Sequence, residues 1–98
     1  MTLLRSDRSA DTDAPILELY RHRWSTRIFD AEATLPPEDL RTALEAARWS
    51  PSAGNNQPWR FLIGPRGSEV HARLFAALDG SNPTWAGDAA VLVGVVAV

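Results

Sequence analysis

The pattern Arg-Trp-Ser-Thr-Arg at residues 23–27 places two guanidinium groups and one hydroxyl at alternate positions. The β-branched residues Thr26 and Ile28 favour extended backbone there. In extended backbone alternate side chains point the same way, so Arg23, Ser25 and Arg27 would share one face. Two guanidinium forks beside a hydroxyl can hold a phosphate or a polyol. The alternative is a pair of solvated arginines at a helix end, where positive charge suits the helix dipole.

A second polar segment, residues 50–59, reads Ser-Pro-Ser-Ala-Gly-Asn-Asn-Gln-Pro-Trp. Pro51 and Pro58 exclude regular structure, and Gly54 and the asparagines tolerate left-handed backbone. These properties predict a shaped loop that presents small polar groups and backbone amides to a ligand. The alternative is an ordinary connector between a helix and a strand, because this composition marks loops in general.

The composition bounds the class of protein. The chain has 98 residues, of which 45% are hydrophobic and 22% charged, so it forms one small globular domain at most. The net charge of −2 argues against a nucleic-acid partner. The absence of cysteine excludes disulfides and thiolate metal sites. His22 and His71 lack metal-ligand spacing, so we interpret both as surface or helix-face residues and expect no metal.

The two ends of the sequence indicate a soluble, cytoplasmic protein. The N-terminus has no apolar signal segment, and residues 1–13 are expected to be a disordered polar tail. The longest apolar run, residues 89–98, is shorter than the roughly 20 residues that span a bilayer. We therefore expect no membrane partner.

Three helices are predicted around the two polar segments. The first follows Asp13, and the second opens at Pro37 and stops before Pro51, which disfavours helical backbone at its predecessor. Ser68 is expected to cap the third helix, which ends at Gly80. Apolar residues at helical spacing predict a buried face on the last two helices. They are Leu40, Ala43, Leu44 and Ala47 in the second, and Val70, Leu74, Ala77 and Leu78 in the third.

Two strands are predicted, at residues 59–64 and 89–98, with a loop at residues 81–85 between the third helix and the second strand. The second strand is apolar on both alternating faces, which is typical of a strand buried on both sides. The residues alone favour parallel pairing through the third helix. A sheet of two strands is marginal and would expose a valine-rich edge. We therefore expect the chain to be the N-terminal part of a longer protein, or partner chains to complete the sheet.

Three segments together resemble the FMN-dependent nitroreductase family: residues 23–27 followed by Phe29, residues 50–59, and Asn-Pro-Thr-Trp-Ala at residues 82–86. Their order and spacing agree with the family over about residues 15–98. The resemblance implies an α+β fold with three α/β/α layers and a mixed sheet containing much antiparallel pairing. Residues 14–98 would be the N-terminal part of that domain, with about three helices and two core strands.

The resemblance also implies that FMN binds at a homodimer interface. Arg23 would hold the phosphate side, while Ser25 and Arg27 would reach the ribityl chain and the pyrimidine edge. The loop at residues 51–55 would contact the flavin of the other subunit, and Asn82 the flavin of its own. The implied cofactor-binding residues are Arg23, Trp24, Ser25, Arg27, Pro51, Ser52, Ala53, Asn55 and Asn82, with no catalytic side chain and no metal ligand.

The sequence departs from the family pattern at three positions within the three segments. Trp24 stands where a basic residue is common, Ala53 where a hydroxyl is frequent, and Trp85 where some members carry lysine. The resemblance implies that the basic residues completing the family's phosphate site would lie beyond Val98.

The function implied by the resemblance is that of an NAD(P)H oxidoreductase. It would pass hydride through flavin N5 to a small-molecule acceptor such as a nitroaromatic or a quinone, and these 98 residues alone are expected to be inactive. The alternative is a truncated or divergent chain that packs like the family without retaining flavin.

Overall fold

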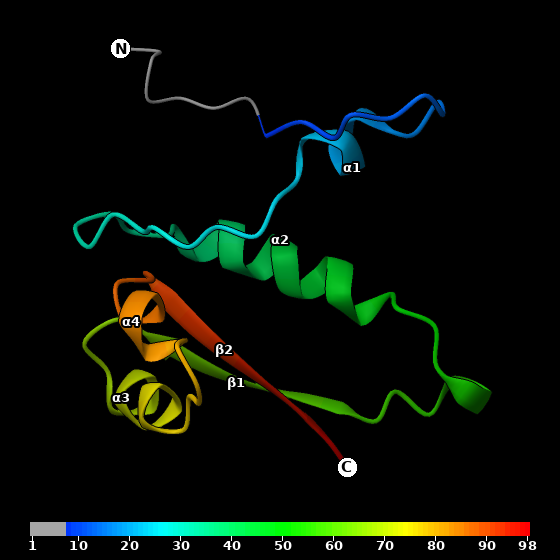
Figure 1. Ribbon diagram of the computed structural model, residues 1–98. Coiled ribbons are helices and arrows are strands. Elements are labelled where there is room, and N and C mark those ends of the chain that lie inside the picture. Colours follow the sequence, from blue (N-terminus) through cyan, green and yellow to red (C-terminus); the bar gives the residue numbers. More distant parts are fainter. Residues whose placement is uncertain (1–7) are drawn as a thin grey trace, which may run out of the picture.

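The computed structural model describes residues 8–98 (Figure 1). In chain order the elements are α1 (Glu18–His22), α2 (Pro37–Arg48), the 3-10 turn η1 (Ala53–Asn55), β1 (Trp59–Pro65), α3 (Glu69–Ala76), α4 (Pro83–Ala86) and β2 (Val91–Ala97). Helices and two strands confirm the predicted α+β class.

The two strands pair antiparallel, with Trp59 opposite Ala97 and Pro65 opposite Val91. The parallel pairing favoured by the residues alone is therefore wrong, and the antiparallel pairing implied by the resemblance is confirmed. The physical reason lies in the connection between the strands. α3 and α4 fold back so that the chain re-enters the sheet where it left, and the Arg66 N–H donates to the Ala90 carbonyl over 2.8 Å.

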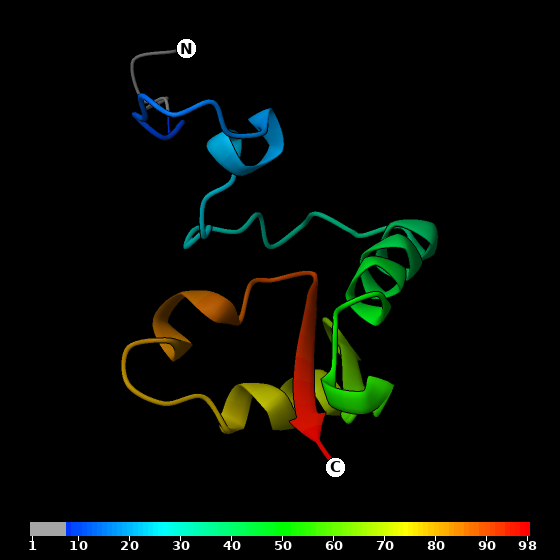
Figure 2. The same cartoon turned by 90° about the vertical axis from the view of Figure 1, so that its right-hand side faces the viewer.

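The elements form three layers, with α2 on one side of the strand pair and α3 and α4 on the other (Figures 1 and 2). The close contact is on the α3 side. A Cβ added at Gly64 would lie 2.6 Å from the backbone nitrogen of His71, and one added at Gly94 would lie 2.8 Å from Leu74 Cδ2. Two strand glycines thus let α3 approach the sheet closely.

The face toward α2 is packed far less closely. A gap of about 500 Å³ separates α2 from the start of β1, and none of the α2 residues is fully buried. Leu40, Leu44 and Ala47 are half-buried, whereas Ala43 is exposed, so the predicted buried stripe is only partly formed. Because α2 stands off from the sheet, its apolar face keeps contact with solvent.

The prediction that the second strand is buried on both faces is wrong for this chain. Val93, Val95 and Val96 of β2 are 42–64% exposed. The reason is that residues 8–98 form a sheet of two strands, so no further strand lies along the outer edge of β2. In the described part of the chain the buried hydrophobic residues are Ala86 and Ala89.

The helix signals read from the sequence are accurate at several ends. α2 begins at Pro37 as predicted, and the Ser68 hydroxyl accepts the His71 N–H at 3.1 Å, which confirms the cap. The predicted end of α3 at Gly80 is wrong. The N–H groups of Ala77 and Leu78 donate to carbonyls three residues back, which tightens the last turn and stops the helix at Ala76.

Two short helices differ from expectation. α1 begins at Glu18 rather than soon after Asp13, because the backbone of Leu17 is still extended, with ψ of 140°. α4 occupies part of the predicted loop at residues 81–85, since Pro83 has the backbone angle that suits the first position of a helix. Residues 1–7 of the predicted tail lie outside the described residues. Within the rest, the Ala10 N–H donates to the Arg21 carbonyl over 2.8 Å.

Candidate functional site

The arginine segment, residues 23–29, leaves α1 in extended backbone, beginning with Arg23 at φ −78° and ψ 139°. Trp24, Ser25 and Arg27 line one surface hollow of about 350 Å³, whereas Arg23 is exposed and does not line it. Within residues 8–98 the ion pairs engage other cations, so neither Arg23 nor Arg27 is held by a carboxylate. Both guanidinium groups can therefore bind an anion.

The end of the arginine segment packs against α4. The rings of Phe29 and Trp85 stack with their centroids 6.0 Å apart and an interplanar angle of 27°. Asn82, the residue before α4, is exposed, and its side chain makes no capping bond. Within residues 8–98 the buried Trp85 Nε1–H also has no hydrogen-bond partner. The stacking contact therefore joins the arginine segment to α4, where the Asn82 side chain and the Trp85 Nε1–H make no hydrogen bond within residues 8–98.

A second contact fastens the chain just beyond the arginine segment. Arg66, in the turn after β1, donates from Nη2 to the Ala33 carbonyl and from Nη1 to the Asp88 carbonyl, the latter over 2.8 Å. One side chain thus connects the loop before α2 with the loop before β2.

The polar loop, residues 50–58, is held by its own hydrogen bonds. The Ser52 hydroxyl accepts the Gln57 N–H at 3.0 Å, and the Gln57 amide donates to Asn55 Oδ1 at 3.0 Å. Gly54, Asn55 and Gln57 have φ of 60°, 56° and 48°, in the left-handed region. The predicted loop geometry is confirmed, whereas its contact with a ligand stays a prediction. The local bonds explain how two non-glycine residues adopt this backbone.

One chain does not bring the two polar segments together. The polar loop follows the C-terminal end of α2, and both views show it apart from the arginine segment (Figures 1 and 2). Pro51, Ala53 and Asn55 are exposed and Ser52 is half-buried. This separation suits the expectation that the loop serves the cofactor of another subunit.

Arg8 is the residue at this site that sequence reasoning missed. It lines the same hollow as Ser25 and Arg27, together with Thr26 and Ile28. A lone arginine in a polar N-terminal stretch gives no local signal, because its place depends on the hydrogen bonds that Ser9 and Ala10 make with α1.

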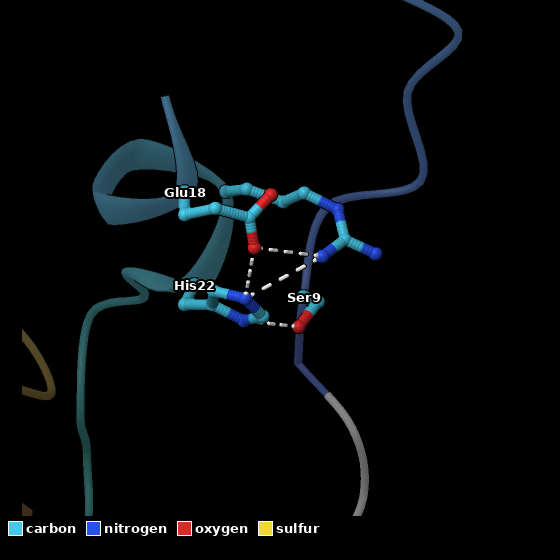
Figure 3. Close-up of polar contacts among 4 residues, drawn as sticks. Ser9, Glu18 and His22 are labelled. Carbon is cyan, nitrogen blue, oxygen red and sulfur yellow. Dashed lines mark hydrogen bonds and ion pairs between the residues drawn. The ribbon is translucent and has the colours of Figure 1, made fainter. Parts of the chain in front are cut away.

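The histidines differ from each other in their surroundings. His22 is exposed, and its Nε2 lies 2.8 Å from the Glu18 carboxylate (Figure 3). This hydrogen bond is the main cause that lowers the pKa of Glu18, and the charge of Arg21 lowers it further. His71 lies on the sheet-facing side of α3 and is buried, with Nε2 3.3 Å from the Ala89 carbonyl. The interpretation of His71 as a helix-face residue holds, but a surface position is wrong.

The described residues hold no group of three or more His, Asp or Glu side chains that could bind a metal ion. Between residues 8 and 98 there is also no helix of the length and apolar character needed to cross a membrane. The chemistry of the hollow is that of an anion site, because two guanidinium groups and two hydroxyls line it and no carboxylate does.

Comparisons with known proteins agree with this geometry. Residues 20–93 match the family model described as the nitroreductase family. A predicted NAD(P)H nitroreductase of Haemophilus influenzae is 40% identical over 52 residues, which cover 53% of this chain and 24% of that protein. The major NAD(P)H-flavin oxidoreductase of Aliivibrio fischeri is 37% identical over 49 residues, which cover 50% of this chain and 22% of that protein.

A solved structure gives the widest overlap among these comparisons. The crystal structure of an oxidoreductase containing FMN superposes with a TM-score of 0.82 at 38% identity, covering 97% of this chain and 47% of that chain. The chain therefore spans about a quarter of the length of the curated relatives and about half of the solved one. Because the family match runs from the end of α1 into β2 and includes the arginine segment, the polar loop and Asn82, this chain belongs to the nitroreductase family.

Proposed function

We propose that this chain contributes the N-terminal half of the binding site in an FMN-dependent NAD(P)H oxidoreductase, with a nitroaromatic, a quinone or a similar small molecule as acceptor. The observation that carries the proposal is the grouping of Ser25 and Arg27 around one hollow, on a segment that stacks against the helix following Asn82. Family membership supports the same cofactor.

The residues present fit FMN by their donor chemistry. The phosphate of FMN is a dianion, and Arg23 and Arg27 are guanidinium groups without a carboxylate partner in the described part of the chain. The Ser25 hydroxyl and the Asn82 amide supply neutral hydrogen bonds. When bound, FMN would supply the hydride-transfer chemistry, taking hydride from NAD(P)H and passing it to the acceptor.

The chain's own residues then act by binding and orientation. Arginine near the anionic parts of the cofactor lowers the energy of added negative charge, and the stacked Phe29 and Trp85 fix the distance between the arginine segment and α4. The polar loop would complete the site from a second subunit, which supports a homodimer. Within this proposal no side chain of residues 8–98 acts as acid, base or nucleophile.

The second candidate is a chain that packs like the family and retains no flavin. The exposed valines of β2 and the wide gap between α2 and β1 favour it, because both leave the fold loosely packed. The test is to purify the chain and record its visible absorbance before and after NADH or NADPH is added. Because residues 1–98 alone are expected to be inactive, flavin retention is the deciding outcome. Flavin absorbance retained after incubation with FMN supports the cofactor site whether or not the nucleotide bleaches it, and a colourless protein that gains no flavin contradicts the proposal.

A further inference from the structure

The connection between α3 and α4 contains the dipeptide Asp79–Gly80, which lies outside the cofactor-binding segments. Asp79 is the one aspartate of the sequence that precedes a glycine, and no asparagine precedes one. Both residues of the dipeptide are exposed. Gly80 has φ of 62°, and a Cβ added to it would meet no atom within 4 Å beyond its chain neighbours. The Gly80 nitrogen therefore has no side chain beside it and open space around it.

The Asp79 carboxylate already contacts that nitrogen. The Gly80 N–H donates to Asp79 Oδ1 over 2.8 Å. Because the carboxyl carbon is bonded to this acceptor oxygen, it also lies close to the Gly80 nitrogen. A carboxyl carbon beside the nitrogen of the following residue is the arrangement from which an aspartate can close a cyclic imide.

The surroundings of two other aspartates are different. Asp30 Oδ1 accepts the N–H of Glu32, which is two residues along the chain, at 2.9 Å. Closure onto that nitrogen would need a larger ring. Asp88 is followed by the buried Ala89, whose N–H donates to a backbone carbonyl over 3.1 Å. Sequence and geometry therefore both favour Asp79 over these two positions.

We propose that Asp79–Gly80 is a modification site at which the chain converts its own aspartate to isoaspartate. The Gly80 nitrogen attacks the carboxyl carbon of protonated Asp79. A new C–N bond forms, and the amide proton and the carboxyl hydroxyl leave as water. Water then adds to the imide and breaks its C–N bond to the former main-chain carbonyl carbon. That carbon becomes a free carboxylate, and the chain now runs through the former side chain. Water is the only co-reactant.

The conversion lengthens the main chain by one carbon just before α4. The Asn82 N–H donates to the Asp79 carbonyl over 3.3 Å, and this carbonyl leaves the main chain when isoaspartate forms. The Thr84 hydroxyl donates to the Ser81 carbonyl over 2.6 Å, which links the same connection to α4. The start of α4 should therefore shift. An effect on flavin contact through Asn82 would rest on the proposed function, whereas the conversion itself does not.

The first arm of the test follows the chemistry in water enriched in the heavy oxygen isotope, because imide hydrolysis places one solvent oxygen in the product. The unmodified chain, Asp79→Glu and the control Asp88→Glu are incubated folded at neutral pH. Each is then cleaved after Arg73 in ordinary water, and the fragment of residues 74–98 is sequenced by electron-transfer mass spectrometry.

We expect heavy oxygen and isoaspartate at position 79 in the unmodified chain and in Asp88→Glu. Asp79→Glu should lose both, because the extra methylene enlarges the ring that must close. The proposal is overturned if position 79 gains no heavy oxygen, or if position 88 of the unmodified chain gains as much.

The second arm reads the effect on α4. Amide NMR spectra of the unmodified chain are recorded during the same incubation. We expect second resonances of Asn82 and Thr84 to grow as isoaspartate accumulates, while Thr42 on α2 keeps a single resonance. If Asn82 and Thr84 keep single resonances although position 79 has been converted, the predicted shift of α4 is wrong.

Discussion

Arg23 opens the extended segment with an exposed guanidinium that pairs with no carboxylate among residues 8–98. Such a group can bind an anion at a small cost in free energy, because no existing ion pair has to break first. The two arginines of the segment differ, since Arg27 lines the hollow and Arg23 lies outside it. At the scale of single residues, the proposed site therefore has two separate cationic positions, Arg27 in the hollow and Arg23 outside it.

Replacing Arg23 with alanine is expected to weaken FMN binding. A hydrogen bond to a charged group contributes roughly 1.5–3 kcal/mol, which corresponds to about a ten- to hundredfold loss of affinity. Flavin fluorescence titration of Arg23→Ala against the unmodified chain measures it, with Arg73→Ala as a control at an exposed position on α3. Equal affinities for all three proteins would remove Arg23 from the site.

The acid sensitivity of α2 depends on Glu45. Its carboxylate accepts hydrogen bonds from Arg48 Nε at 2.9 Å and from Trp49 Nε1 at 2.8 Å, and these bonds lower its pKa to about 2. Because the pKa is lower in the folded chain, the stabilising effect is complete above the usual value of 4.5 and is lost as the pH falls toward 2.

We expect Arg48→Gln to raise the pKa of Glu45 more than Arg41→Gln does. Arg48 supplies a hydrogen bond and a charge, whereas Arg41 acts through charge alone and is the weakest of the contributions. A carboxyl-carbon NMR titration of Glu45 in the three proteins measures both shifts. An equal pKa in both variants would show that the side-chain hydrogen bond from Arg48 to Glu45 does not form in solution.

The residue types and spacing were sufficient to predict some contacts and insufficient for others. Ser68 was identified as a cap because the bond it accepts is local, three residues along the chain. Arg8 was missed because its neighbours in space, Ser25 and Arg27, lie in a segment that only the folded N-terminal stretch brings close.

At the scale of elements, the fold depends on how closely α3 approaches the sheet. We expect Gly64→Ala to destabilise the chain by about 1–3 kcal/mol, because the added Cβ would meet the backbone of His71 at 2.6 Å. Gly94→Ala is the matched control, since its Cβ meets the movable end of the Leu74 side chain at 2.8 Å. Urea unfolding of both variants measures the difference, and equal stabilities would contradict a backbone clash.

The cap of α3 gives a second prediction about elements. Ser68→Ala removes the acceptor of the His71 N–H and should lower stability by about 1 kcal/mol. Ser81→Ala, at an exposed position before α4, provides a comparison with the same atoms removed. If thermal unfolding shifts both variants alike, the cap contributes nothing beyond the loss of a surface hydroxyl.

Element types were predictable where the signal was local. The Pro-Glu-Asp start of α2 and the apolar run of β1 both lie where expected. Strand direction was not predictable from the residues, because it depends on the fold of residues 77–90, where a single helical turn beginning at Pro83 reverses the chain. The family resemblance supplied the antiparallel pairing that local patterns could not.

At the scale of the whole molecule, the two-stranded sheet leaves large apolar side chains exposed. Val93, Val95 and Val98 are exposed along β2 and the residue after it, and neither strand has a neighbour on its outer edge within residues 8–98. Exposed strand edges of this kind pair readily with other chains. The sequence predicted burial for these valines because apolar side chains are usually buried. The sequence pattern does not show which strand or chain would cover them.

We expect the 98-residue chain to associate in solution and to elute above its mass of 10.7 kDa. Val95→Lys should reduce the association, because a lysine cannot be buried there without losing its hydration. Ala76→Lys, on the exposed end of α3, adds the same charge away from the sheet. Size-exclusion chromatography with light scattering measures all three, and a monomeric unmodified chain would contradict the expectation.

The bridge from Arg66 to Ala33 and Asp88 has a consequence for engineering. The turn at residues 65–67 lies outside the cofactor-binding segments, yet its Arg66 supplies one of the contacts, beside the Phe29–Trp85 stack, that hold the loop before α2 to the rest of the fold. A graft that replaces this turn with a hairpin lacking arginine would remove this anchor from the part of the chain that carries Arg23, Ser25 and Arg27, without changing any cofactor-binding residue in the sequence. Libraries aimed at altered cofactor affinity should therefore vary position 66 separately from the arginine segment.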